Sequence, residues 1–157
     1  MKIFIILVLF LTSLLVSQEL QVKANKFSAD EKAGISIFEG DVNIIKGYDE
    51  LNASKVTIFT NKEHQPTKYV ALGDVSFKIK TKKGSKYEGV AGKVIYLPIA
   101  KEYHFFKNVY LKQIDEKKEI LGDEVVLKTI EGKAYAKGVK TEPVIMIFNI
   151  PKEEGEE

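Results

Sequence analysis

The sequence predicts an all-β fold with internal repeats, on two observations. After residue 18, apolar residues recur at alternate positions and no stretch keeps them at helical spacing, so each run presents one buried and one solvated face. Two short sequence elements also alternate along the chain, with a full period of about 30 to 38 residues. A repeat of this length indicates stacked β units that bury one continuous apolar interior.

Residues 1–17 predict a secretory signal peptide. Lys2 is followed by an apolar run over residues 3–16, and the small Ser17 precedes the first polar residues. As a helix, residues 3–16 would span only about 21 Å, whereas a bilayer core needs about 30 Å. Cleavage after Ser17 is the prediction, and a retained single-pass anchor is the alternative. In both cases the remainder of the chain lies outside the cytoplasm.

The body of the chain, residues 18–142, is predicted to form one domain of short strands. The alternating runs fall at 42–44, 56–58, 75–80, 94–96, 109–112 and 125–128. Breaks rich in Gly, Asp and Asn separate them, and these breaks predict turns, bulges and corners. Residues 143–157 are predicted as a C-terminal edge strand with an acidic tail.

Two motifs carry the repeat. The Ala-x-Lys-[Phe/Val] motif occurs at 24–27, 53–56 and 91–94, with a degenerate copy at 122–125. The Gly-Asp-Val motif occurs at 40–42 and 73–75 and decays to Lys-Asn-Val at 107–109 and Lys-Gly-Val at 137–139. The two motifs alternate, so the chain contains four copies of one unit.

With a secretory signal in front, this alternating series resembles the OstA-like/LptA family of periplasmic lipopolysaccharide-transport proteins. The best local match runs through 38–44 and 51–56, and the resemblance spans about residues 20–140. It implies a V-shaped, twisted β-jelly roll of stacked antiparallel strands. It also implies a periplasmic bridge protein for outer-membrane assembly, whose members join head to tail. The implied partners are lipopolysaccharide and the inner-membrane and outer-membrane jelly-roll components of the export machine.

A stacked β interior with an aliphatic lining suits acyl chains, because burial is worth about 0.8 kcal/mol per CH₂ group. The inward-facing residues form a collective candidate lipid-binding lining, although each would also serve simply as core. They are Ile35, Ile37, Val42, Ile44, Val56, Ile58, Val75, Phe77, Ile79, Val94, Tyr96, Val109, Leu111, Val125 and Leu127.

The two ends of the domain are candidate oligomer edges. The C-terminal segment is apolar on both faces, so we expect its surface to be buried against another segment. The N-terminal strand of a second molecule would bury it by strand addition. The edge residues are Leu20, Val22, Val144, Ile145, Met146, Ile147 and Phe148. The alternative is that this segment folds back onto its own domain as a last core strand.

A lysine-rich run and an aromatic cluster each allow two interpretations. Lys78, Lys80, Lys82, Lys83 and Lys86 would meet the phosphates of a lipid head group, or form a solvated loop that protects a sheet edge. The aromatic cluster at 103–106 would form a mouth for acyl chains, a docking patch, or an ordinary strand.

The composition argues against an enzyme. There is no Cys, and the two His residues lie far apart in sequence, so no metal site or cofactor is expected. A net charge of +2 gives no general attraction to nucleic acid. The alternatives left open are a membrane-tethered jelly-roll subunit of the same pathway, a structural β filament that binds no lipid, and a carbohydrate-active β-solenoid enzyme. The enzyme would need a carboxylate cluster on one face, which the sequence does not display.

Overall fold

The structure is a computed structural model that describes residues 19–151 and Gly155, so the predicted signal peptide lies outside the described residues. The described chain is all-β, as the alternation predicts. Its strands are β1 (Leu20–Lys23), β2 (Lys26–Asp30), β3 (Ile35–Lys46), β4 (Asp49–Thr60), β5 (Pro66–Lys80), β6 (Lys86–Leu97), β7 (Glu102–Gln113), β8 (Lys118–Lys128), β9 (Lys133–Lys137) and β10 (Ile145–Phe148).

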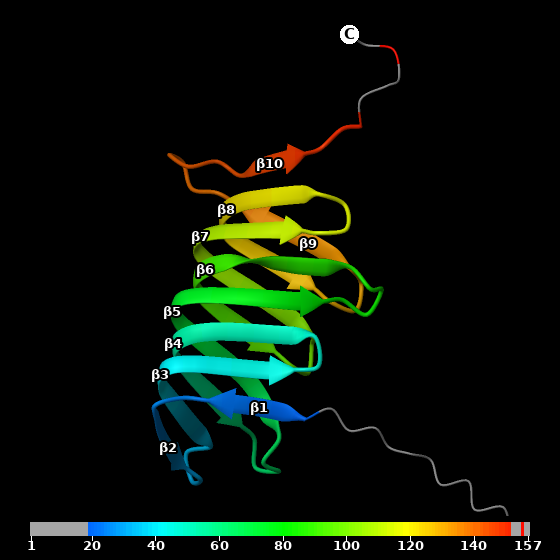
Figure 1. The fold of residues 1–157 in the computed structure, drawn as a ribbon. Coiled ribbons are helices and arrows are strands. Elements are labelled where there is room, and N and C mark those ends of the chain that lie inside the picture. Colours follow the sequence, from blue (N-terminus) through cyan, green and yellow to red (C-terminus); the bar gives the residue numbers. More distant parts are fainter. Residues whose placement is uncertain (1–18, 152–154, 156–157) are drawn as a thin grey trace, which may run out of the picture.

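All of these strands belong to one antiparallel sheet, in which consecutive strands from β2 to β9 pair with each other. The order is β1-β3-β4-β5-β6-β7-β8-β10, with β2 also paired to β3 and β9 also paired to β8. Figure 1 shows the result as a stack with β1 and β2 at one end and β10 at the other. Nearest-neighbour pairing is what a repeat with short connections favours.

The long strands are continuous through the predicted breaks, and each bends in its middle at a bulge. The pairing register shifts at Gly40–Asp41 in β3, at Gly73–Asp74 in β5 and at Lys107–Asn108 in β7. Both residues of each pair have positive φ, for example 83° at Gly73 and 44° at Asp74. The Gly-Asp-Val motif is therefore a mid-strand corner, and the short runs expected from the sequence are halves of strands of 11 to 15 residues.

These bends fold the sheet into two facing leaflets. The first leaflet contains β2, β9 and residues 35–39, 55–60, 66–72, 93–97, 102–106 and 124–128. The second contains β1, β10 and residues 42–46, 49–52, 75–80, 86–90, 109–113 and 118–122. In Figure 1, β1 and β10 cross in front and β2 and β9 lie behind.

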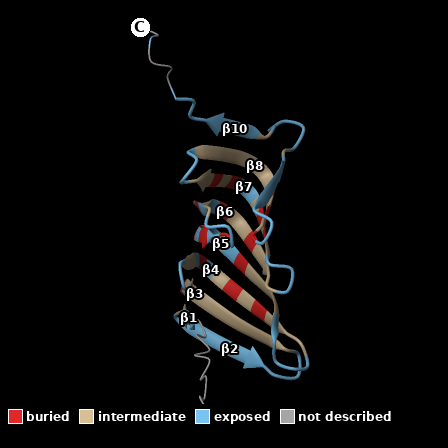
Figure 2. Cartoon of the chain, turned by 90° about the vertical axis from the view of Figure 1, so that its right-hand side faces the viewer, coloured by how far each residue is buried: buried red, intermediate tan, exposed pale blue. Residues whose placement is uncertain are grey.

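The core lies between the leaflets. Phe77 of the second leaflet meets Phe105 of the first with ring centroids 4.4 Å apart. Phe105, Val125 and Leu127 have no exposed surface. Figure 2 shows the buried residues within the middle strands, whereas β2 and β10 are exposed.

The C-terminal segment joins its own domain as an edge strand. β10 pairs antiparallel with β8, so that Ile145 lies opposite Leu121 and Phe148 opposite Lys118. Its four side chains nevertheless stay 44–53% exposed. The segment extends the sheet without completing the core.

Candidate functional site: an apolar groove between the leaflets

An open groove of about 470 Å³ lies between the leaflets on the side opposite the bends. We call this open side the mouth. The apolar wall comes from both leaflets, because residues of β3, β4 and β5 in the second leaflet face residues of β4, β5, β6 and β7 in the first. The wall comprises Ile44, Leu51, Phe77 and Ile79 from the second leaflet, and Val56, Tyr69, Ala71, Val94, Tyr96 and Tyr103 from the first.

The predicted lining divides into three groups. Six of its residues line the groove: Ile44, Val56, Phe77, Ile79, Val94 and Tyr96. Seven others are buried in the core outside the groove lining: Val42, Ile58, Val75, Val109, Leu111, Val125 and Leu127. The remaining two, Ile35 and Ile37, lie on the outer face of the sheet, so the prediction is wrong for them.

Ile35 and Ile37 lie on the outer face because Phe38 takes the inward position in this stretch. Residues directly opposite each other share a face of the sheet. Phe38 is paired with the buried Val56, whereas Ile37 is paired with Thr57. The polar Ser36 shares the inward face with Phe38, so the alternation of Ile35, Ser36 and Ile37 indicates the wrong face.

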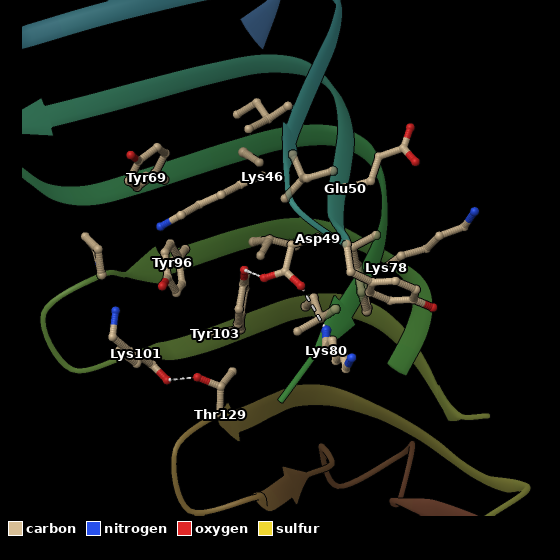
Figure 3. Close-up of a pocket in the computed structure, with 18 of the residues that line it drawn as sticks. Lys46, Asp49, Glu50, Tyr69, Lys78, Lys80, Tyr96, Lys101, Tyr103 and Thr129 are labelled. Atoms are coloured by element: carbon tan, nitrogen blue, oxygen red, sulfur yellow. Dashed lines mark hydrogen bonds between the residues drawn. The ribbon is translucent and has the colours of Figure 1, made fainter. Parts of the chain in front are cut away.

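A cluster of aromatic and carboxyl groups crosses the mouth. The Tyr103 hydroxyl of the first leaflet donates to Asp49 Oδ2 of the second leaflet at 3.3 Å. Asp49 Oδ1 accepts the backbone N–H of Lys80 at 2.9 Å. Figure 3 shows these two bonds and the neighbouring ring of Tyr96, whose centroid lies 4.3 Å from that of Tyr103.

Burial shifts the ionisation of this cluster. It raises the pKa of the Asp49 carboxyl, while its hydrogen bonds to Lys80 and Tyr103 and the charge of Lys46 act in the opposite direction. Burial and the negative charge of Asp49 hold the pKa of Tyr103 well above its usual range. Tyr103 therefore stays a neutral hydrogen-bond donor at neutral pH.

A second link joins the leaflets beside the first. The backbone N–H of Lys82, in the β5–β6 turn, donates to the carbonyl of Thr129 at 3.1 Å. The Thr129 hydroxyl donates in turn to the carbonyl of Lys101 at 2.9 Å. These contacts connect the leaflets at the β7–β8 side, where the interior is filled by Leu111 and Leu127. The groove therefore opens toward β3, β4 and β5.

Basic residues surround the mouth, and they are only partly those of the predicted lysine run. Lys78, Lys80 and Lys82 border the groove, whereas Lys83 and Lys86 do not. Lys46 and Lys101 border it as well. The sequence pattern did not single out these two lysines, although Lys46 lies two positions after Ile44 and so shares its inward face.

The predicted oligomer edges lie at opposite ends of the stack. Leu20 borders the groove from β1, and Val22 packs against the core. At the other end Val144 is half-buried just before β10, and Ile145, Met146, Ile147 and Phe148 are exposed on it. Among the described strands, β1 and β10 each pair with a single partner, so each presents a backbone edge that no other described strand covers.

The described residues contain no helix long and apolar enough to cross a membrane. Within residues 19–151, no three His, Cys, Asp or Glu side chains gather as metal ligands would. What the groove offers chemically is apolar surface with hydroxyl, carboxyl and ammonium groups at its mouth.

Comparisons with known proteins agree with this architecture. A search of curated proteins gave no significant match. Among solved structures, one match is LptH, the LptA-homologous periplasmic component of the lipopolysaccharide transport device of Pseudomonas aeruginosa. Its TM-score is 0.75 at 18% identity, covering 85% of this chain and 96% of that chain. A family model described as LptA/(LptD N-terminal domain) LPS transport protein matches residues 21–133, so this chain belongs to that family.

Proposed function

We propose that this chain is a periplasmic carrier that binds lipopolysaccharide by its acyl chains in the groove and passes it from the inner to the outer membrane. The observation that carries the proposal is the apolar groove of about 470 Å³ that stays open inside a fold of this family. An acyl chain of about a dozen carbons transferred from water would gain on the order of 10 kcal/mol. Such a protein binds and releases its ligand without catalysis.

Site-specific photo-crosslinking tests where lipid binds. A photo-reactive residue at Ile44 or Tyr96, both half-exposed in the groove, should capture lipopolysaccharide. The matched control is Val90, which is 48% exposed and paired with Tyr110 on the outer face. Equal capture from Val90, or silence at both groove positions, would refute the proposal.

Co-elution measures the same binding on the unmodified protein. Purified residues 18–157 are mixed with detergent-dispersed lipopolysaccharide and separated by size exclusion, with a detergent blank. Stoichiometric co-elution is expected. A folded protein that elutes empty would instead favour the structural filament, with the apolar lining serving only as core.

The bridge would form by head-to-tail strand addition between the β1–β2 end and the β9–β10 end. Two different edges that join make a heterologous contact, which continues into a filament unless it closes into a ring. The exposed apolar residues of β10 support this arrangement. In the bridge, the terminal copies would meet the inner-membrane and outer-membrane jelly-roll components.

Adding charge to β10 tests this assembly while the strand stays in the chain. The double variant Ile145→Lys/Ile147→Lys should lower the sedimentation mass, because lysine on an edge strand opposes pairing. Val90→Lys is the control, since Val90 is equally exposed on the outer face but lies in β6, away from either end. An unchanged mass in the β10 variant would contradict assembly through this edge.

Residues 1–17 decide between a released and a tethered protein. The mass of the periplasmic product should correspond to cleavage after Ser17. A retained segment in the membrane fraction would favour the membrane-tethered subunit of the same pathway.

A further inference from the structure

Two lysines at the mouth of the groove are placed toward its interior. In β3, Lys46 follows the same face as Ile44, and its register partners Asp49 and Leu20 also border the groove. Lys101 approaches from the β6–β7 turn of the first leaflet. In Figure 3 the ammonium groups of Lys46 and Lys101 extend toward the rings of Tyr69 and Tyr96. Groups from both leaflets therefore converge on one side of the mouth.

Among the described residues, neither Lys46 nor Lys101 forms an ion pair within 4.0 Å with the carboxylates beside it, although the charge of Asp49 attracts Lys46. The two oxygens of Asp49 accept from Lys80 and Tyr103. Glu50 is paired with Lys78 on the outer face, where it accepts from Asn43. Among the described residues, the ion pairs within 4.0 Å use other lysines: Lys26, Lys55, Lys118, Lys128 and Lys133.

The hydroxyls of Tyr69 and Tyr96, which line the same groove as the two lysines, are donors. Burial raises the pKa of both Tyr69 and Tyr96, so their phenols remain protonated at neutral pH. Ammonium and hydroxyl groups together form the donor set that surrounds a phosphate, whose oxygens accept several charge-assisted hydrogen bonds. Ala71 and Val94 belong to the apolar lining of the same groove.

We propose that Lys46, Lys101, Tyr69 and Tyr96 form a head-group subsite for a phosphate monoester whose alkyl chain occupies the groove. The subsite rests on the proposed lipid-carrying function and adds a polar selectivity to it. The groove would thus prefer an anionic amphiphile over a neutral one of equal chain length. Because the mouth is open to water, this preference is screened by salt.

The test compares three probes: a twelve-carbon alkyl phosphate, the alcohol of the same chain length, and inorganic phosphate. Dissociation constants for the two amphiphiles come from displacement of an apolar fluorescent dye. Binding of inorganic phosphate is followed by NMR of the tyrosine rings. We expect the alkyl phosphate to bind at least about tenfold more tightly than the alcohol at low salt, with a smaller ratio at high salt.

In the double variant Lys46→Gln/Lys101→Gln, the alkyl phosphate should bind no more tightly than the alcohol. The affinity for the alcohol should stay unchanged. Its matched control is Lys23→Gln/Lys137→Gln, which removes two exposed lysines of β1 and β9 that do not border the groove. The control should keep the full ratio. A control that loses the ratio equally would assign the effect to net charge and overturn the subsite.

The probes also separate failure of the subsite from failure of the carrier function. If the alcohol binds and the phosphate adds nothing, the subsite is wrong and the apolar groove stands. If neither amphiphile displaces the dye, both proposals fail. Inorganic phosphate that binds as tightly as the alkyl phosphate would make this a free-anion site and refute its head-group role.

Discussion

The corner at Gly73 offers a direct test of how the repeat folds. Gly73 has a φ of +83°, and an added Cβ would lie 2.6 Å from Ser54 Oγ and 2.8 Å from Ser54 Cβ. In the third copy of the motif Lys107 takes the glycine's place, and the residue facing it is Gly92, whose own Cβ would lie 2.9 Å from Lys107 Cβ. One member of each facing pair must be glycine for the corner to close.

The expected energies follow from this geometry. In Gly73→Ala, positive φ costs about 1–2 kcal/mol and the contact with Ser54 about 1–3 kcal/mol, so the loss of stability is about 2–5 kcal/mol. Ser54→Gly alone should cost about 1–2 kcal/mol, since it removes a strand side chain and a 3.3 Å bond to the Gly73 carbonyl. In the double variant the contact disappears, so its cost should fall about 1–3 kcal/mol below the sum of the single costs.

Urea denaturation of the two single variants and the double variant measures this coupling. Gly84→Ala is the matched control, because Gly84 has a φ of +94° with nothing within 4 Å of the added Cβ. It should show the cost of positive φ alone. Additive effects of Gly73→Ala and Ser54→Gly, or equal losses in Gly73→Ala and Gly84→Ala, would refute the facing-pair explanation.

Three further outcomes follow from the mouth and the core. Tyr103→Phe should lower stability by about 1 kcal/mol in urea denaturation, since it removes one long bond to a carboxylate that keeps its second donor. The pKa of Asp49 is raised in the folded state, so the folded protein holds this proton more tightly than the unfolded chain does. The resulting contribution to folding stability is present below the usual pKa of 3.8 and is lost as the pH rises. Asp49→Asn should therefore gain stability relative to wild type between pH 3 and pH 7; a constant difference would contradict this. Leu127→Ala should cost about 2–5 kcal/mol, whereas Ile44→Ala should cost less and chiefly weaken lipid binding.

The sequence predicted the fold because its repeat is tied to backbone geometry. The Gly-Asp step at 73–74 can be identified from sequence since positive φ at two successive residues restricts residue choice. The same constraint explains why the decayed copy at 107–109 keeps Asn108, a residue that tolerates the left-handed region. The sequence left open whether each break is a turn, a bulge or a corner, and the structure shows the Gly-Asp steps as bulged corners within continuous strands.

The site was less predictable, because side chains meet there across the two leaflets. Asp49 and Tyr103 are 54 positions apart and belong to different motif copies. The spacing of the sequence repeat does not relate these two residues to each other. Their contact depends on how far each leaflet extends beyond its bend. Lys46 and Lys101 could not be predicted for the same reason. Each lies outside the lysine-rich run at 78–86, and only the fold brings the two to one groove.

The position of the groove within the stack follows from side-chain size along one row of the first leaflet. Val56, Ala71, Val94, Phe105 and Val125 are successive partners across β4 to β8, so they face the second leaflet side by side. The small Ala71 belongs to this row and lines the groove together with Ile44 and Leu51 of the second leaflet. At Phe105 the row meets the ring of Phe77 at 4.4 Å, and the interior becomes packed. A lipid held in the groove would therefore occupy the β3–β6 part of the stack, and its movement toward β8 would require the leaflets to separate at the Asp49–Tyr103 bond.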